Sequence, residues 1–266
     1  MYTFVTSFNK EGYDTYAKHM LESISEKFNP DYFQLFAYYH DFDIESVPHP
    51  ICRSIHYRNL NNVKEMVEYR ERMKIHDGTE GGKIEYNWRL DAIKWCHKVY
   101  ALTEHAFEMM EANSNILNGG IVPDDDWLIW IDADTVATKR LEVEKVNEWL
   151  PIKADLVHLG RKDVDYSETS FMAFNLISHN ACSILADLRG CYTIGETISY
   201  REWHDGFIFE RLLNIYKAHG MEVKNLSENV KGLDAFGQSP LSEFFTHYKG
   251  NKKKNIKSLK TTPDGS

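Results

Sequence analysis

Short apolar and aromatic runs alternate with amphipathic segments along this chain, and this alternation predicts a parallel α/β sheet. The stretches YTFVTS (2–7) and YFQLFAYYH (32–40) are typical of strands, and a helical pattern from about Tyr13 to Lys27 separates them. A longer amphipathic stretch from Trp88 to Met110 predicts a helix or a helix pair. It ends before a break at Pro123, after which the apolar run WLIWI begins.

The second half of the chain continues the same alternation. ADLVHLG (154–160) and FMAFNLI (171–177) predict strands, whereas 179–189 and 205–219 predict helices. The polar glycine-rich stretch DGTEGG (77–82) is interpreted as a connector, because no P-loop Lys-Ser/Thr follows it. With no internal repeat and no Pro/Gly/Ser-rich linker, the pattern predicts one domain over residues 1–250 and a lysine-rich tail over 251–266.

Composition narrows the class of protein further. The chain has 266 residues and a formal net charge of −9, so it offers no global electrostatic attraction for nucleic acid. Its four cysteines are scattered and form no metal-binding pair, which is typical of reduced thiols. Neither a signal peptide nor an apolar run long enough to span a bilayer is seen. We therefore expect a cytoplasmic protein, located in the host cytoplasm if it is viral.

The run WLIWI leads directly into two aspartates, Asp132 and Asp134. If the strand persists through Ala133, both side chains project from the same face. Ligands of α/β sheets collect beyond the carboxyl ends of strands, and adjacent carboxylates there suit a hard cation such as Mg²⁺ or Mn²⁺. The alternative is a helix cap formed by Asp134 or Thr135, which explains one aspartate and not the other.

Two enzyme classes place D-x-D after an apolar strand. In haloacid-dehalogenase phosphatases the first aspartate, here Asp132, is the nucleophile. In glycosyltransferases of the GT-A fold the pair binds a metal that contacts a nucleotide-sugar diphosphate. The C-terminal H-x-x-G-x-x-K formed by His247, Gly250 and Lys253 favours the second class, because it adds an imidazole ligand, a close backbone approach and a cation for a diphosphate.

D-x-D together with this C-terminal motif resembles the retaining GT-A glycosyltransferases of the glycogenin and bacterial galactosyltransferase kind. The related xylosyl- and galactosyltransferases use H-x-x-G-x-K, which Lys252 also satisfies. Weaker similarities follow in the family's order. The first is FVTSFNKEGYDTYAKHMLES, with Thr6 and Tyr13 at matching positions, and the second is HKVYALTEH, with Lys98 and with Arg89 nine residues before it. The others are FMAFNL and EWHDGFIFERL, the latter with Asp205 and Gly206.

The resemblance implies an α/β, GT-A-like (Rossmann-like) single domain with a mainly parallel central sheet, and a retaining, metal-dependent transfer from a nucleoside-diphosphate sugar. It implies Mn²⁺ or Mg²⁺ ligands in Asp132, Asp134 and His247. It implies catalytic roles for Asp205, beside the reacting carbon, and for Lys98. The donor contacts that it implies are Thr6, Tyr13, Arg89, Lys98, Asp132, Gly250 and Lys253.

Each of these residues also has a plain structural interpretation. Lys98 is also typical of an exposed lysine on a helix, Arg89 of a surface or structural ion pair, Asp205 of a helix cap, and Tyr13 of a core ring. Other histidines show no companion ligands and are assigned to packing or to the surface, namely His97, His158, His179 and His204.

The acceptor stays open, because the family's Ser-Gly after the acceptor-side strand and its Gln after Asp205 are missing. The lysine cluster of the C-terminal segment indicates either diphosphate binding or a polyanionic acceptor such as the hydroxymethylated DNA of viruses. Otherwise the acceptor is a glycan, a protein or a small molecule. A catalytically dead module that binds sugar nucleotides is a further alternative from a different class.

Overall fold

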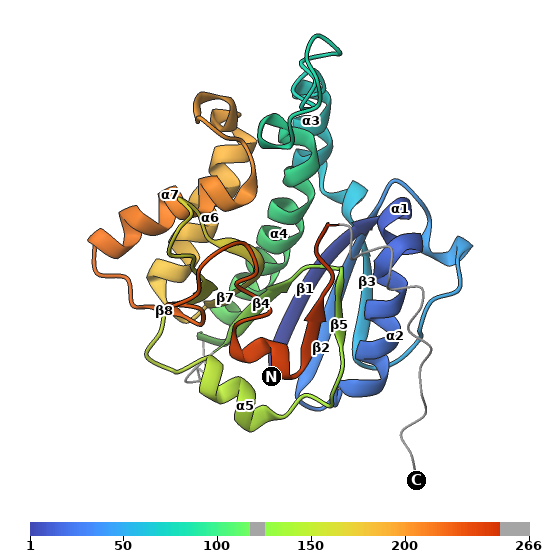
Figure 1. Cartoon of the computed structure of the whole chain (residues 1–266). Coiled ribbons are helices and arrows are strands. Elements are labelled where there is room, and N and C mark those ends of the chain that lie inside the picture. The colour runs from blue at the N-terminus through green and yellow to red at the C-terminus, as the bar shows by residue number, and fades with distance from the viewer. Residues whose placement is uncertain (118–125, 251–266) are drawn as a thin grey trace.

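The computed structural model describes residues 1–117 and 126–250, and a central β-sheet covered by helices forms its body (Figure 1). The strands are β1 Tyr2–Asn9, β2 Phe33–His40, β3 Ile55–Asn59, β4 Trp127–Ile131, β5 Thr135–Ala137, β6 Leu156–Leu159, β7 Glu168–Asn175, β8 Val223–Asn225 and β9 Phe245–His247. The α-helices are α1 Lys10–Gly12, α2 Lys18–Lys27, α3 Lys64–Arg72, α4 Ala92–Leu117, α5 Val143–Trp149, α6 His179–Thr193 and α7 Asp205–Ala218.

Seven strands pair in the order β3-β2-β1-β4-β7-β6-β8, and β7 alone among them runs against its neighbours. This confirms the prediction of a mainly parallel sheet. The carboxyl ends of the parallel strands therefore meet at one edge, where ligands of such sheets bind. Because β7 is reversed, its first residue, Glu168, reaches the edge at which β4 ends.

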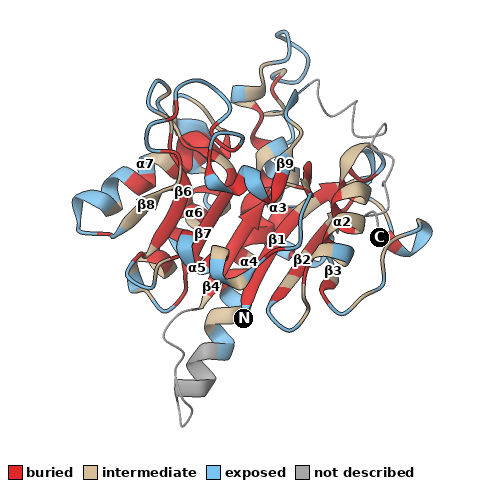
Figure 2. Ribbon diagram, turned by 60° about the horizontal axis from the view of Figure 1, so that its bottom comes forward, coloured by how far each residue is buried: buried red, intermediate tan, exposed pale blue. Residues whose placement is uncertain are grey.

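Successive side chains along a strand point to opposite faces of the sheet, and a hydrophobic core lies on each face. On β1, Phe4 packs with the core on the α2 side, whereas its neighbour Val5 packs with the core on the α4 side. Both side chains are almost fully buried, as are the five residues of β4. Figure 2 shows the strands buried along most of their length, with exposed positions concentrated in loops and on outer helix faces. Burial on both faces explains why β4 is continuously apolar.

The helix predicted over 13–27 begins three residues earlier, and the helical segment has three parts. Helix α1 is capped by the Asn9 side chain, a π-helical segment follows over Tyr13–Ala17, and α2 continues to Lys27. The helix predicted over 88–110 begins after a 3₁₀ turn at Trp88–Leu90 and extends to Leu117. Hydrophobic patterning does not predict α3, α5 or the short strands β5, β8 and β9.

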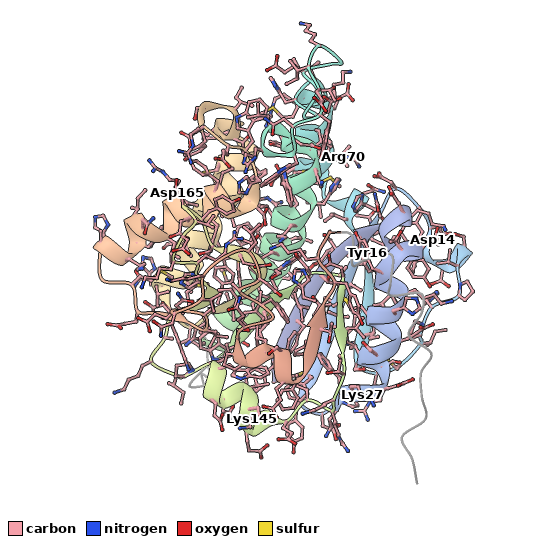
Figure 3. The ribbon with its side chains drawn as sticks, in the orientation of Figure 1. Asp14, Tyr16, Lys27, Arg70, Lys145 and Asp165 are labelled. Carbon is pink, nitrogen blue, oxygen red and sulfur yellow. The ribbon has the colours of Figure 1, made fainter. Side chains whose placement is uncertain are left out.

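Strands β5 and β9 form a separate antiparallel ribbon outside the main sheet. In Figure 3, Arg70 on α3 lies toward the edge where β1 and β2 end, and Lys145 on α5 lies toward the opposite edge. Across the described residues, none of the helices combines the length and apolar character that a membrane span needs. The predicted tail over 251–266 lies outside the described residues.

Candidate active site

The aspartate pair is brought together by a turn. Strand β4 ends at Ile131, and the backbone N–H of Asp132 still donates to Ser170 O on β7 at 3.0 Å. The chain then turns through Ala133 and Asp134, with Thr135 N donating to Asp132 O at 3.1 Å. The strand thus ends before Ala133, whereas the same-face prediction required it to continue through this residue. The helix-cap alternative is wrong, because β5 follows the turn and the next helix, α5, has Glu142 at its N-cap.

The β5–β9 ribbon carries His247 to this turn. Its register pairs Thr135 with His247, and Tyr248 N donates to Asp134 O at 2.9 Å. His247 Nε2 consequently lies 3.1 Å from Asp134 Oδ1. Candidate ligand atoms of Asp132, Asp134 and His247 all lie within 4.8 Å of one another. Three residues predicted as metal ligands are therefore gathered at one place, at the carboxyl end of β4.

The environment of these three residues suits a divalent cation. The side chains of Asp134 and His247 are only 7% and 4% exposed, whereas that of Asp132 is 27% exposed. Burial would lower the pKa of His247, but the carboxylates, Asp134 first, outweigh it and raise the pKa. The surrounding carboxylates favour a positive charge on this imidazole. A metal cation can supply that charge in place of the proton. Two carboxylates and one imidazole fit Mn²⁺ or Mg²⁺, with Asp132 on the open side.

Glu168 is a member of this site that the sequence does not reveal. Its side chain is 3% exposed, and its Oε1 lies 3.6 Å from His247 Nδ1, a buried nitrogen with no hydrogen-bond partner among the described residues. Lys249 Nζ lies 2.7 Å from the same Oε1, and Ala235 N donates to Oε2 at 3.1 Å. Glu168 therefore places a buried carboxylate beside the imidazole, on the side away from Asp134, at a position that the reversal of β7 makes available.

Lys98 is buried between two carboxylates. Its Nζ lies 2.8 Å from Asp132 Oδ1 and 2.9 Å from Asp205 Oδ2, and it donates to Thr169 O at 2.9 Å. Burial alone would lower the pKa of Lys98, but the two carboxylates outweigh burial and raise it. The interpretation of Lys98 as an exposed lysine is therefore wrong. Trp130 Nε1 also donates to Asp132 Oδ1 at 2.7 Å, which fixes this carboxylate from two sides.

Asp205 is the first residue of α7, and the helix is capped by its neighbour His204, whose ring accepts from Phe207 N. The cap interpretation of Asp205 is therefore wrong. Its carboxylate is 4% exposed, binds Lys98 and accepts from Thr169 Oγ1 at 2.6 Å. Burial would raise its pKa, yet Lys98 foremost holds the pKa below its usual value. The group is an ionised, buried carboxylate linked through one cation to the Asp132 carboxylate.

The other predicted donor contacts lie further from this cluster. Arg89 is half exposed, stacks over Trp88 and binds Glu202 at 3.2 Å. Thr6 is buried on β1, with its Oγ1 lacking a hydrogen-bond partner among the described residues. Tyr13 packs among aromatic rings and donates to Pro48 O.

At the C-terminal motif, Gly250 has a φ of +59°, a left-handed conformation that favours glycine. Lys253 lies outside the described residues. Lys249 precedes both and is tied to Glu168 and to Leu233 O. The described part of the motif therefore contains one candidate metal ligand, His247, and includes Lys249, which contacts Glu168 beside it.

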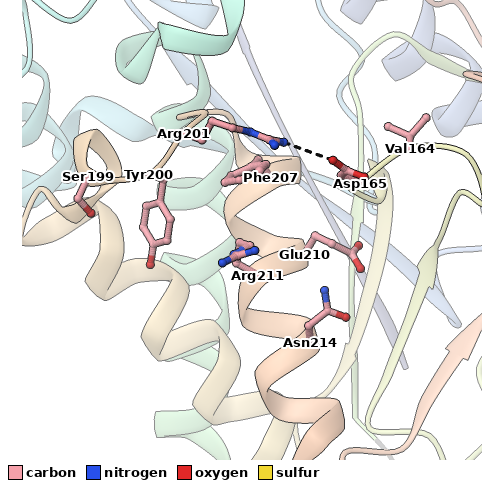
Figure 4. Close-up of a pocket in the computed structure, with 9 residues that line it drawn as sticks. All are labelled: Val164, Asp165, Ser199, Tyr200, Arg201, Phe207, Glu210, Arg211 and Asn214. Carbon is pink, nitrogen blue, oxygen red and sulfur yellow. Dashed lines mark hydrogen bonds and ion pairs between the residues drawn. The ribbon is translucent and has the colours of Figure 1, made fainter.

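A separate open cavity of about 650 Å³ flanks α7. Figure 4 shows its side chains, with Arg201 reaching across to Asp165 above the ring of Phe207. None of the predicted site residues lines it. The lining residues are Val164, Asp165, Ser199, Tyr200, Arg201, Phe207, Glu210, Arg211 and Asn214.

Comparison with known proteins gives structural similarity only. Neither a protein-family model nor a curated protein matches the sequence. Among solved structures, a glycosyltransferase involved in glycosylation of the major capsid of PBCV-1 is similar, with a TM-score of 0.50, 10% identity, and coverage of 97% of this chain and 100% of that chain.

Two further solved structures resemble the chain at lower scores. Mouse xyloside xylosyltransferase 1 has a TM-score of 0.45 and 12% identity, covering 94% of this chain and 97% of that chain. Galactosyltransferase LgtC has 0.49 and 12%, covering 98% of each. The similarity to the capsid glycosyltransferase confirms the predicted fold class, a GT-A-like α/β domain.

Proposed function

We propose that this protein is a metal-dependent glycosyltransferase that moves a sugar from a nucleoside-diphosphate sugar to an acceptor hydroxyl. The observation that carries the proposal is the convergence of Asp132, Asp134 and His247 at the carboxyl end of β4. The fold that holds this cluster is also that of a glycosyltransferase. Similarity to a glycosyltransferase structure at 10% identity supports the fold, whereas the chemistry is inferred from the side chains.

Mn²⁺ or Mg²⁺ would be held by the two aspartates and His247, and when bound it would neutralise the charge that develops on the departing diphosphate. Asp132 is the more exposed carboxylate, so the donor would approach from its side. Gly250 and Lys253 would support the same diphosphate, while Thr6, Tyr13 and Arg89 would contact the nucleotide or the phosphates. Lys98 would act as a positioning residue, since it holds the carboxylates of Asp132 and Asp205 at fixed places.

Asp205 would lie beside the anomeric carbon and stabilise the positive charge of an oxocarbenium-like transition state. Its carboxylate already accepts bonds from Lys98 and Thr169, which weakens it as a covalent nucleophile. The proposal therefore includes retention by attack on the same face, with the leaving phosphate taking the proton of the acceptor hydroxyl. The bond from the anomeric carbon to the phosphate oxygen breaks as the bond to the acceptor oxygen forms.

The acceptor would be a glycan, a protein or a small molecule. The DNA alternative rested on the C-terminal lysines. Lys249, which the structure describes, is engaged by Glu168 and a backbone carbonyl. The remaining lysines of that cluster lie outside the described residues, so no observation favours DNA.

A thermal-shift panel tests the donor site. UDP, GDP, ADP and CDP compounds and their sugars are each added with and without Mn²⁺ to the wild-type protein, to Asp134→Asn and to Asp163→Asn, an exposed aspartate, as a matched control. A ligand at about 100 times its Kd should stabilise the fold by roughly 2.7 kcal/mol. We expect one base to stabilise the wild type and the control only with Mn²⁺, and Asp134→Asn to lose the effect. No shift with any nucleotide would overturn the proposal.

The two alternatives predict different results. A phosphatase with Asp132 as nucleophile would bind beryllofluoride with Mg²⁺, whereas a glycosyltransferase would not; Asp132 Oδ1 is already occupied by Trp130 and Lys98, and the fold does not favour this alternative. A dead module would bind the donor but neither transfer nor hydrolyse the sugar. Incubation of the nucleotide sugar that gives the shift, followed by measurement of released nucleoside diphosphate, separates these cases.

A further inference from the structure

We propose a second metal site, of the zinc class, formed by His40, Asp41 and His97. His40 is the last residue of β2, Asp41 follows it, and His97 lies on α4. The site lies at the edge of the sheet where the parallel strands end, since His40 is paired with Asn9, the last residue of β1. It shares no residue with the Asp132–Asp134–His247 cluster and does not depend on the proposed function.

The three side chains offer ligand atoms that all lie within 4.8 Å of one another. The imidazoles of His40 and His97 stack with ring centroids 3.7 Å apart and an interplanar angle of 12°. His40 Nδ1 lies 2.9 Å from Asp41 Oδ2. Because the lone pairs of stacked rings lie in two nearly parallel planes, one ring has to rotate about its Cβ–Cγ bond for both rings to reach one ion. His40 can do so by exchanging its contact with Asp41 for the ion.

His97 supplies the observation that points to a ligand. Its Nε2 is shut off from solvent and has no hydrogen-bond partner among the described residues. An imidazole nitrogen that is buried without a hydrogen-bond partner, beside a second imidazole and a carboxylate, has the surroundings of a metal-ligating histidine. Without an ion, this nitrogen is buried and unsatisfied.

The position of the Asp41 carboxylate is determined by its backbone conformation and by Arg70. It has a φ of +63°, in the left-handed region that aspartate occasionally adopts. Arg70 on α3, labelled in Figure 3, contacts both of its oxygens, at 2.8 and 3.0 Å. The guanidinium thus holds the carboxylate next to the imidazoles, and it also competes with a cation for the same oxygens. We therefore expect loss of Arg70 to strengthen metal binding.

The ligand set fixes the class of metal. Two imidazoles and one carboxylate suit Zn²⁺ and Co²⁺, whereas the Asp132 cluster, with two carboxylates, suits Mn²⁺ or Mg²⁺. A fourth position would be open toward solvent on the side of Asp41, which is exposed. An ion here would connect the end of β2 to α4 one residue before Lys98.

The experiment uses the full chain with any affinity tag removed, treated with a chelator, and carrying Asp134→Asn so that the first site is weakened. Zn²⁺ is titrated by calorimetry, and Co²⁺ by its visible absorption, which reports the ligand set directly. We expect one equivalent of Zn²⁺ and a Co²⁺ spectrum that Zn²⁺ displaces. His97→Gln should reduce the affinity by more than the roughly 10–100-fold that loss of an outer partner causes.

Three variants sharpen the result. His179→Gln replaces an exposed histidine and should leave binding unchanged. Asp41→Asn tests the site on the surface, where misfolding is not an issue, and should weaken binding as His97→Gln does. Arg70→Gln should tighten it. The proposal is overturned if no Co²⁺ spectrum develops, or if neither His97→Gln nor Asp41→Asn lowers the Zn²⁺ affinity. Nucleotide-dependent shifts are read at the other site, so failure here leaves the proposed function standing.

Discussion

The ammonium group of Lys98 lies 2.9 Å from the carboxylate of Asp205, with both side chains almost fully buried. The same ammonium group lies 2.8 Å from Asp132. One cation from the second turn of α4 thereby joins a predicted metal ligand to the carboxylate at the start of α7. The relative positions of these two carboxylates depend on this lysine.

Lys98→Met should lower the free energy of unfolding by about 3–5 kcal/mol, because it leaves buried carboxylates without their cation. Lys145→Met is the matched control, since Lys145 pairs with Glu148 on the surface of α5 and such pairs contribute about 0–1 kcal/mol. Urea denaturation of both variants measures the difference. If Lys98→Met were no less stable than Lys145→Met, the carboxylates would have to be compensated by other groups.

Glu168→Gln should weaken Mn²⁺ binding by about 10–100-fold, because the Glu168 carboxylate, 3.6 Å from His247 Nδ1, is placed to act as the outer partner of this ligand. The variant preserves the size of the side chain, and the exposed Glu228→Gln serves as the control. Mn²⁺ affinity is measured by electron paramagnetic resonance of the free ion. Unchanged affinity in Glu168→Gln would restrict the residue to binding Lys249 and the Ala235 backbone.

Asp205→Asn should reduce the rate of sugar transfer or donor hydrolysis by about 10²–10³-fold, which is the scale of losing one group that stabilises developing charge. Donor binding with Mn²⁺ should change little, since Asp205 is not among the metal ligands. Steady-state kinetics beside the thermal-shift measurement separate the two effects. Equal losses in binding and rate would instead place Asp205 in the donor site itself.

The stability of the protein should fall as the pH drops below about 6.5, and His158 should contribute to this fall. Burial, with a smaller effect of Lys217, lowers the pKa of His158 to about 3, whereas in the unfolded chain it lies near 6.5. The unfolded state therefore takes up the proton first. The stability due to neutral His158 is complete above the unfolded pKa and is lost as the pH falls toward 3.

His158→Gln tests this by removing the titration. Between pH 6.5 and pH 5, one such histidine accounts for up to about 2 kcal/mol, at 1.36 kcal/mol per pH unit. The loss of unfolding free energy over this range should be smaller by that amount in His158→Gln, and unchanged in the exposed His179→Gln. Equal pH slopes in His158→Gln and wild type would show that His158 titrates normally in the folded protein. Denaturant titrations at three pH values give the comparison.

Much of the fold could be predicted because its strands are long and strongly apolar. Strands β1, β2, β4 and β7 each carry an apolar or aromatic run that only a buried sheet accommodates. Strands β5 and β9 have three residues each, too few to show a period. Their pairing depends on packing between distant segments, which local propensity does not encode.

The candidate site residues likewise include some that the sequence predicts and some that it does not. Asp132 and Asp134 follow from a local motif, whereas His247 followed from a family resemblance and reaches Asp134 through the ribbon. Glu168 was missed because the reversal of β7 is a property of the sheet. His97 was assigned to packing or to the surface, since nothing in the sequence places it against His40 at the end of β2.

The β5–β9 ribbon has a consequence for the order of events during synthesis. The aspartate turn leaves the ribosome long before His247, and the imidazole can join it only when β9 pairs with β5. Until then a nascent chain lacks one of the three candidate ligands, even where its sheet has begun to form. Capacity to bind the cation would therefore arise in one late step, and an arrested chain that stops before residue 247 would lack it.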